Sequence, residues 1–358
     1  NPSFRPTFRL HHGAVALAGA LACLGVMFLI HPGWALAAII PAWLLYRLIA
    51  RAEIRVTWGD VVSGLAYQRA RDALLRLEQE RYHPKNWRPT ILALSGGAYN
   101  RRHLADYAGW LSGENGLVSI GQVIRGDLSR LVDRRREAEA ILRRFIREEQ
   151  RRAFPVVVVD EDIHAALQAL LQCHGIGGLR PNTVLLGWSR DPEKSGVFFE
   201  ILKTSKRMQR SLVVVACEQE TEQTQVRDGA INVWWTTDRN GPLLLLLAFL
   251  LRKNAEWRDR PLRLLRPVPP RADADNVRRE MNDLLAAARL EAELVLLPTE
   301  APLEAVREAM RPSAVLFAGF DPPEEAPSGF FLPYLQQIAE LPGDVILVYN
   351  AGDVSLQA

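Results

Sequence analysis

The sequence predicts an α/β protein, in which a two-helix transmembrane hairpin precedes a two-lobed domain of mostly parallel sheets. Two long apolar runs, residues 10–30 and 34–50, lie close together near the start. Short runs rich in Val, Ile and Leu then alternate with helical patterns, which is typical of βαβ units. A polar stretch, residues 218–229, separates these runs into two groups of five.

The hairpin is predicted over residues 1–55. Each apolar run is close to the roughly 20 residues that a helix needs to cross a bilayer, and His31-Pro32-Gly33 breaks the chain between them. The flanks are basic and the connecting turn is not, so the positive-inside rule puts both termini and the large domain in the cytoplasm of a multi-pass membrane protein. The flanking cations are Arg5, Arg9, Arg47, Arg51 and Arg55. The alternatives are a secretory signal, which the second apolar run disfavours, and a buried hairpin of a soluble protein.

An amphipathic linker helix is predicted within residues 56–85. Over residues 58–81, apolar side chains recur at helical spacing, and Arg and Glu occupy the opposite face. We expect this helix to connect the hairpin with the α/β domain.

The two lobes are predicted over residues 86–228 and 229–358, from the order of their elements and not from a sequence repeat. The first five strands are expected at residues 91–94, 117–123, 156–159, 183–186 and 212–216. The second five are expected at residues 232–235, 262–268, 294–297, 314–317 and 345–348. The apolar run 242–251 is too short to span a membrane, so we interpret it as a buried helix.

Composition disfavours several classes of function. The net charge is only +3 and the Arg residues are interspersed with Glu, so there is no basic footprint of a nucleic-acid-binding protein. The three cysteines are scattered, which predicts neither a disulfide framework nor a metal site. The cluster Asp160-Glu161-Asp162 with His164 is interpreted as a helix start, where acidic residues are favoured. Because no nucleophile elbow or HExxH motif is present, we do not expect an enzyme.

Several motifs occur in the order found in one transporter family. They are residues 1–30, WGD (58–60) with 70–78, NWRP (86–89), GIGGLRPNTVLLGW (175–188), INVWW (231–235), GPLLLLLAFLL (241–251) and RLEAE (289–293). Together they resemble the last two transmembrane helices and the C-terminal cytoplasmic domain of the cation–chloride cotransporters, within the amino acid–polyamine–cation transporter superfamily. The linker is more similar to the potassium-chloride branch than to the sodium-dependent one.

The resemblance implies the function of a larger assembly. In the family, the cytoplasmic domain has two lobes similar to universal stress proteins and mediates dimerisation and regulation. The chain is then the C-terminal portion of a cation:chloride symporter, which couples chloride to potassium and/or sodium. The implied partners are the membrane, a second copy in a homodimer, and upstream helices of the same transporter that hold the ion sites. The start at Asn1 fits a piece of a longer protein. The alternative is a free-standing, membrane-tethered α/β protein acting as a nucleotide-binding sensor or a dimer scaffold.

The family also implies a candidate nucleotide site for ATP or ADP in the first lobe. Ligands of open α/β sheets bind at the carboxyl ends of strands, where glycines expose backbone N–H groups near a helix N-terminus and an arginine adds charge. The candidates after the first two strands are Ser95, Gly96, Gly97, Gly121, Arg125 and Gly126. The alternative is that these glycines only form tight turns, since no GxxxxGK[ST] loop is present.

Overall fold

The computed structural model describes residues 13–51, 61–79, 87–97, 99, 101–189, 195–217, 226–268, 273–298, 302–324, 331–352 and 354. The chain divides into two compact units, Asn1–Gln79 and Glu80–Ala358.

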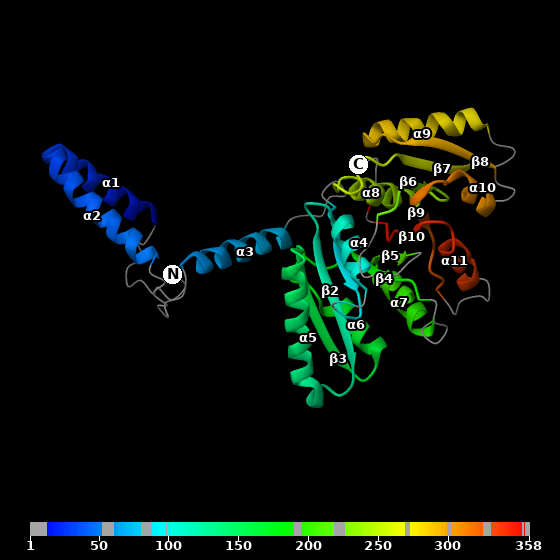
Figure 1. Cartoon of the computed structure of the whole chain (residues 1–358), viewed down its shortest axis with the longest axis horizontal. Coiled ribbons are helices and arrows are strands. Elements are labelled where there is room, and N and C mark those ends of the chain that lie inside the picture. The colour runs from blue at the N-terminus through cyan, green and yellow to red at the C-terminus, as the bar shows by residue number, and fades with distance from the viewer. Residues whose placement is uncertain are drawn as a thin grey trace. The chain divides into compact units, whose positions relative to one another are not determined.

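The first unit contains a helical hairpin. Helices α1 (Gly13–Ile30) and α2 (Pro32–Arg51) pack side by side and are separated only by His31 (Figure 1). Their apolar side chains point largely outward: Leu29 is 85% exposed, Ile30 77% and Trp34 74%. Within residues 13–51 and 61–79, as in the rest of the described chain, no helix is both long enough and apolar enough to cross a membrane. Arg5, Arg9 and Arg55 lie outside the described residues.

The predicted linker helix is present as α3 (Val61–Gln79). Leu65, Tyr67, Leu75 and Leu77 are exposed on it, together with its arginines. The predicted residues at both ends of the linker, including Trp58 and Arg81, lie outside the described residues.

The second unit is built on one sheet of ten strands. Every strand run expected from the sequence lies within or overlaps one of these strands. Their bounds are β1 Thr90–Leu94, β2 Leu117–Arg125, β3 Ala153–Asp160, β4 Thr183–Gly187, β5 Ser211–Ala216, β6 Ala230–Trp234, β7 Leu262–Val268, β8 Glu293–Pro298, β9 Ser313–Gly319 and β10 Asp344–Tyr349. Thus the α/β fold and its mostly parallel sheet are confirmed.

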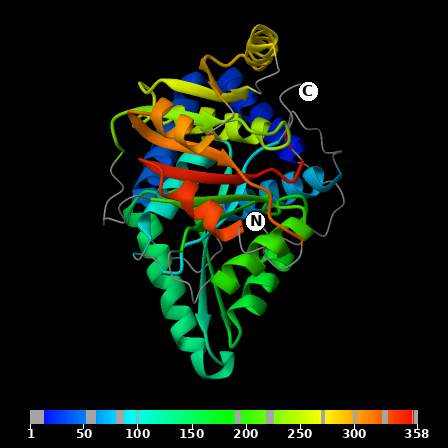
Figure 2. The same cartoon turned by 90° about the vertical axis from the view of Figure 1, so that its right-hand side faces the viewer.

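The strand order shows an internal symmetry. It runs β3-β2-β1-β4-β5-β10-β9-β6-β7-β8, so each half of five strands has the order third, second, first, fourth, fifth. Neighbours pair in parallel except β5 and β10, which pair antiparallel with Val215 opposite Ile346. The residues predicted as two lobes therefore form two halves of one continuous sheet (Figures 1 and 2). Of the polar stretch 218–229, only residues 226–229 lie within the described chain.

Helices cover both faces of the sheet. One core lies under α4 (Arg102–Ser112), α5 (Leu128–Glu148), α8 (Gly241–Arg252) and α9 (Ala274–Ala288). The other lies under α6 (Ile163–Cys173), α7 (Ser195–Arg207), α10 (Pro302–Ala309) and α11 (Phe331–Ala339). The apolar run at 242–251 is the buried helix predicted, with Leu243, Leu247 and Leu251 inaccessible to solvent.

The acidic cluster after β3 is structural, as predicted. The Asp160 side chain accepts a hydrogen bond from the backbone N–H of Asp162, at 2.9 Å. Asp162 is the N-cap of α6, and its side chain accepts from the N–H of His164, also at 2.9 Å. These carboxylates satisfy backbone donors at a helix start, which is the favoured use of Asp there.

Candidate functional site

The candidate site lies in the first half of the sheet, where β1 stands between β2 and β4. The chain leaves β1 toward β2 by way of α4, whereas β4 lies on the other side of β1, so the strand order reverses at this point. In open α/β sheets, ligands bind at the carboxyl ends of strands at such a reversal. The segment that follows β1 there contains Ser95, Gly96 and Gly97.

The segment after β1 combines a buried hydroxyl on Ser95 with open space at Gly96. The Ser95 N–H donates to the Gly121 carbonyl oxygen at 3.2 Å, which extends the ladder with β2. Its hydroxyl is buried, and none of the described residues provides it with a hydrogen-bond partner. Gly96 has φ +80°, which favours glycine, and a Cβ added there would meet no atom within 4 Å. Gly97 is buried.

Gly121 lies next to this segment but is tightly packed. It is paired in register with Leu94 inside the sheet. A Cβ on Gly121 would lie 3.0 Å from Cδ2 of Leu94, so the glycine makes room for a neighbouring side chain. We conclude that its role is packing beneath the site.

Arg125 and Gly126 belong to a separate corner. The Arg125 Nε donates to the Glu161 carbonyl oxygen at 3.2 Å, and the Gly126 N–H donates to that of Asp160 at 2.9 Å. With φ +146° and Leu131 directly against the place of a Cβ, Gly126 is required by the turn into α5. Since Arg125 is four residues beyond Gly121 on one strand, about 13 Å separates the two. The structure thus brings Ser95, Gly96, Gly97 and Gly121 together and leaves Arg125 and Gly126 apart.

Arg101 is a residue at this place that the sequence reasoning missed. It is the N-cap of α4 and makes no side-chain capping hydrogen bond. Its Nη1 atom lies 2.9 Å from where a Cβ on Gly187, the last residue of β4, would stand. A guanidinium and the positive end of a helix dipole therefore lie near the end of β1 and Ser95, a combination that suits an anion. No local signal joins Arg101 to Gly187, because they are distant in sequence.

A cavity of about 370 Å³ adjoins the same segment. It is lined by Tyr99, Gln122, Ile124, Arg134, Glu137, Ala138 and Ile141 from the segment after β1, from β2 and from α5. The Tyr99 ring packs edge-on against Phe145, with 5.1 Å between ring centroids. An aromatic ring, an amide and an arginine at one cavity could bind a planar polar ligand that carries negative charge.

The equivalent place in the second half is filled by the protein's own side chains. Asn240, the N-cap of α8, is 4% exposed and adjoins Gly319 at the end of β9, as Arg101 adjoins Gly187. Its Nδ2 donates to the Phe320 carbonyl oxygen and its Oδ1 accepts from the N–H of Asn350, both at 2.9 Å. A ligand in this second place would have to replace these bonds, so the first half is the better candidate.

The described residues contain no group of three or more His, Cys, Asp or Glu that could hold a metal ion. Within the described part of the chain, Cys23, Cys173 and Cys217 form no disulfide.

Comparison with known proteins supports the fold and the resemblance. The crystal structure of the cytoplasmic domain of a prokaryotic cation chloride cotransporter matches with a TM-score of 0.56 at 15% identity, covering 76% of this chain and 99% of that one. A universal stress protein from Archaeoglobus fulgidus DSM 4304 matches with a TM-score of 0.48 at 12% identity, covering 73% of this chain and 98% of that one. Residues 101–226, from the start of α4 to beyond β5, match the profile of solute carrier family 12. The chain therefore resembles the cation–chloride cotransporters, as its sequence predicted.

Proposed function

We propose that this chain is the C-terminal portion of a cation:chloride symporter, and that its second unit is a cytoplasmic regulatory domain. The observation that carries the proposal is the family match over residues 101–226, which lies inside a fold shared with a cotransporter cytoplasmic domain. The ion sites then belong to upstream helices of the same transporter, and this portion performs no chemistry of its own.

The hairpin α1–α2 is proposed to lie in the membrane. Its outward-facing apolar side chains, such as Leu21 at 61% exposed and Leu45 at 59%, would be costly to hydrate as one continuous surface. The run of residues without a charged side chain, 10–30, also begins before the first residue of α1, Gly13. A lipid environment removes this cost for both helices at once.

Thiol accessibility tests this placement. The full chain carrying Cys173→Ser and Cys217→Ser keeps only Cys23, in α1. The matched control carries Cys23→Ser and Cys217→Ser and keeps Cys173, which is exposed like Cys23. In open membrane fragments, we expect a charged maleimide to label Cys173 but not Cys23 until detergent is added. Equal labelling of both without detergent would contradict a membrane hairpin.

Helix α3 is proposed to transmit contacts of the regulatory domain to the transport helices. Its arginines are exposed, so reversing their charge should alter docking without unfolding the domain: Arg69→Glu, Arg71→Glu and Arg76→Glu. The matched control reverses three exposed arginines of the second unit: Arg144→Glu, Arg147→Glu and Arg152→Glu. When each variant is placed in the whole transporter, with its upstream helices, we expect altered regulation of coupled chloride flux only with the α3 variant. If that variant unfolds, the arginines are structural and the proposal fails.

Dimerisation is part of the same proposal. In a homodimer, the mass measured by light scattering for the full chain in detergent should be about twice that of one chain after subtracting the detergent, and it should fall on dilution. A single-chain mass at every concentration would contradict it.

A nucleotide such as ATP or ADP is the second candidate function, as a regulatory ligand of the first half. It is favoured by the buried Ser95 hydroxyl without a partner, the open space at Gly96 and the guanidinium of Arg101. Binding of ATP at 100 times its dissociation constant would stabilise the fold by about 2.7 kcal/mol. The free-standing sensor, which was the alternative from the sequence, would show the same response without any transporter.

The test compares two glycines of like geometry. Gly96 and Gly352 both have positive φ, at +80° and +109°, and open space around the place of a Cβ. Gly96→Leu and Gly352→Leu therefore introduce similar backbone strain at different places. We expect ATP and ADP to raise the melting temperature of the wild type and of Gly352→Leu, but not of Gly96→Leu. Equal shifts in all three proteins would exclude the site, and no shift in the wild type would exclude nucleotide binding.

A further inference from the structure

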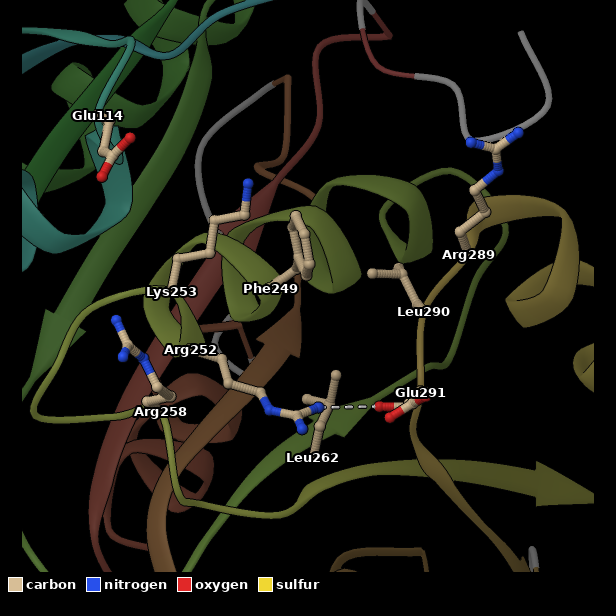
Figure 3. Close-up of a pocket in the computed structure, with 9 residues that line it drawn as sticks. All are labelled: Glu114, Phe249, Arg252, Lys253, Arg258, Leu262, Arg289, Leu290 and Glu291. Carbon is tan, nitrogen blue, oxygen red and sulfur yellow. Dashed lines mark hydrogen bonds between the residues drawn. The ribbon is translucent and has the colours of Figure 1, made fainter.

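A second cavity, of about 560 Å³, lies in the second half of the sheet and shares no residue with the candidate nucleotide site. Its walls are the C-terminal ends of α8 and α9, the segment before β7 and the turn after α4 (Figure 3). The volume is in the range of small-molecule sites. The lining residues are Glu114, Phe249, Arg252, Lys253, Arg258, Leu262, Arg289, Leu290 and Glu291.

The lining combines four cations with an apolar surface, and Nζ of Lys253 lies 4.7 Å from the centroid of the Phe249 ring. None of the four cations takes part in an ion pair with any residue in the described part of the chain; Arg252 donates instead to the backbone carbonyl oxygen of Glu291, at 3.1 Å. Figure 3 shows Lys253 and Arg258 on one side of the Phe249 ring and Arg289 on the other. Phe249, Leu262 and Leu290 supply the apolar surface between them.

Helix dipoles explain only part of this arrangement. Arg252, Lys253 and Arg289 lie at helix C-termini, where cations are favoured without any ligand. Arg258 lies in neither helix, however, and a dipole does not require an apolar cavity between the cations. The two carboxylates, Glu114 and Glu291, form no ion pair with these cations, although they would oppose an anion at the rim.

We propose that this cavity binds an organic phosphate that carries more than one phosphate group, held by Lys253 and Arg258 on one side and by Arg289 on the other, with the carbon skeleton between them resting on Phe249 and Leu290. Guanidinium groups match phosphate oxygens in charge and geometry, and the apolar floor favours a phosphate ester over inorganic phosphate. The same chemistry is offered by a soluble phosphorylated metabolite and by a phospholipid headgroup.

The experiment uses the full chain in detergent and three probes: inorganic phosphate, inositol hexakisphosphate and short-chain dioctanoyl phosphatidylinositol 4-phosphate. The test variant is Arg258→Ser with Arg289→Ser, both exposed. The matched control is Arg278→Ser with Arg307→Ser, which are exposed and do not line the cavity. Affinity is measured by isothermal titration, and melting temperature without probe confirms folding.

We expect the test variant to bind inositol hexakisphosphate or the lipid at least tenfold more weakly than the wild type, while the control is unchanged. Strong binding of inositol hexakisphosphate identifies a soluble phosphate as the source, and binding of the lipid alone identifies a headgroup. The proposal is overturned if the wild type binds neither of them, or binds inorganic phosphate as tightly as the esters. It is also overturned if the test variant binds as the wild type does, or if the control loses as much affinity as the test variant.

Discussion

Tyr107→Phe should weaken the contact between the two halves of the sheet. Tyr107, in α4 of the first half, is fully buried and donates to Oδ2 of Asp344, the first residue of β10, at 2.6 Å. Hydrogen bonds to charged groups contribute about 1.5–3 kcal/mol, so removing this hydroxyl should lower the free energy of unfolding by that amount. The change removes one oxygen and leaves the packing of the ring on Trp110 and Trp257 intact.

Tryptophan fluorescence during urea unfolding measures this loss, because Trp110 and Trp257 report on the same region. Tyr99→Phe is the matched control: Tyr99 is 50% exposed and its hydroxyl lies 3.4 Å from Glu148, a weak contact. If Tyr107→Phe unfolds at the same urea concentration as the wild type at pH 8, the hydrogen bond does not stabilise the junction and the reasoning is refuted.

The same side chain predicts a dependence on alkaline pH. Burial, followed by the nearby Asp344 carboxylate, raises the pKa of Tyr107 well above its ordinary value of 10.0. Above about pH 10 the unfolded chain loses this proton while the folded chain keeps it, so stability falls with rising pH by up to about 1.4 kcal/mol per pH unit. Tyr107→Phe should lack this component of the decline. If the free energy of unfolding falls with pH at the same slope above pH 10 in the variant and the wild type, the prediction is wrong.

Two further predictions concern packing and acid pH. A Cβ at Gly241 would overlap the Trp235 ring, so Gly241→Ala should lower the free energy of unfolding, measured with urea, by about 1–3 kcal/mol or more. The control is Gly109→Ala, in a helix with open space around the new Cβ, which should be neutral or stabilising. Equal effects of the two substitutions would refute the reasoning. Burial lowers the pKa of His174 from its ordinary value of 6.5, and its Nε2 lies 2.8 Å from the Ser119 hydroxyl oxygen. As the pH drops below about 6.5, the unfolded chain gains this proton before the folded chain does. The free energy of unfolding should therefore fall. His174→Gln should reduce the decline in stability between pH 7.5 and pH 5.5, measured as the difference between the urea midpoints at the two pH values. If this difference is the same in the variant and the wild type, the prediction is wrong.

The strands and helices of the second unit could be predicted from the sequence because each is specified by residues close together along the chain. Continuous apolar runs such as that of β5, buried at every position, distinguish parallel strands from helices by length and flanking turns. Adjacent side chains on an extended chain point to opposite faces, and Trp234 and Trp235 accordingly lie in the two different cores. The capping role of Asp162 was likewise encoded in neighbouring residues.

The parts that sequence reasoning missed depend on contacts between distant residues. Nothing in the runs of β5 and β10 specifies that they pair with each other, since antiparallel and parallel partners are equally apolar when both faces are buried. The approach of Arg101 to Gly187 depends on the placement of α4 over β4. For the candidate site, the position after the first expected strand identified Ser95, Gly96 and Gly97. Arg125 was grouped with them because it follows the second expected strand, residues 117–123. In the structure, β2 continues to Arg125, four residues beyond Gly121, which pairs with the end of β1.

The antiparallel pairing of β5 with β10 has a consequence for assembly. Two separate copies of a five-stranded unit could form the same two-fold interface by pairing their fifth strands, but only at sufficient protein concentration. Here both five-stranded halves belong to one polypeptide, so the partner strand is always present at an effective concentration set by the connecting segment. The contact between β5 and β10 within one chain therefore does not depend on protein concentration. The two halves are also free to diverge: the Ser95 hydroxyl of the first half has no hydrogen-bond partner among the described residues, whereas Asn240 fills the equivalent place in the second half with its own hydrogen bonds.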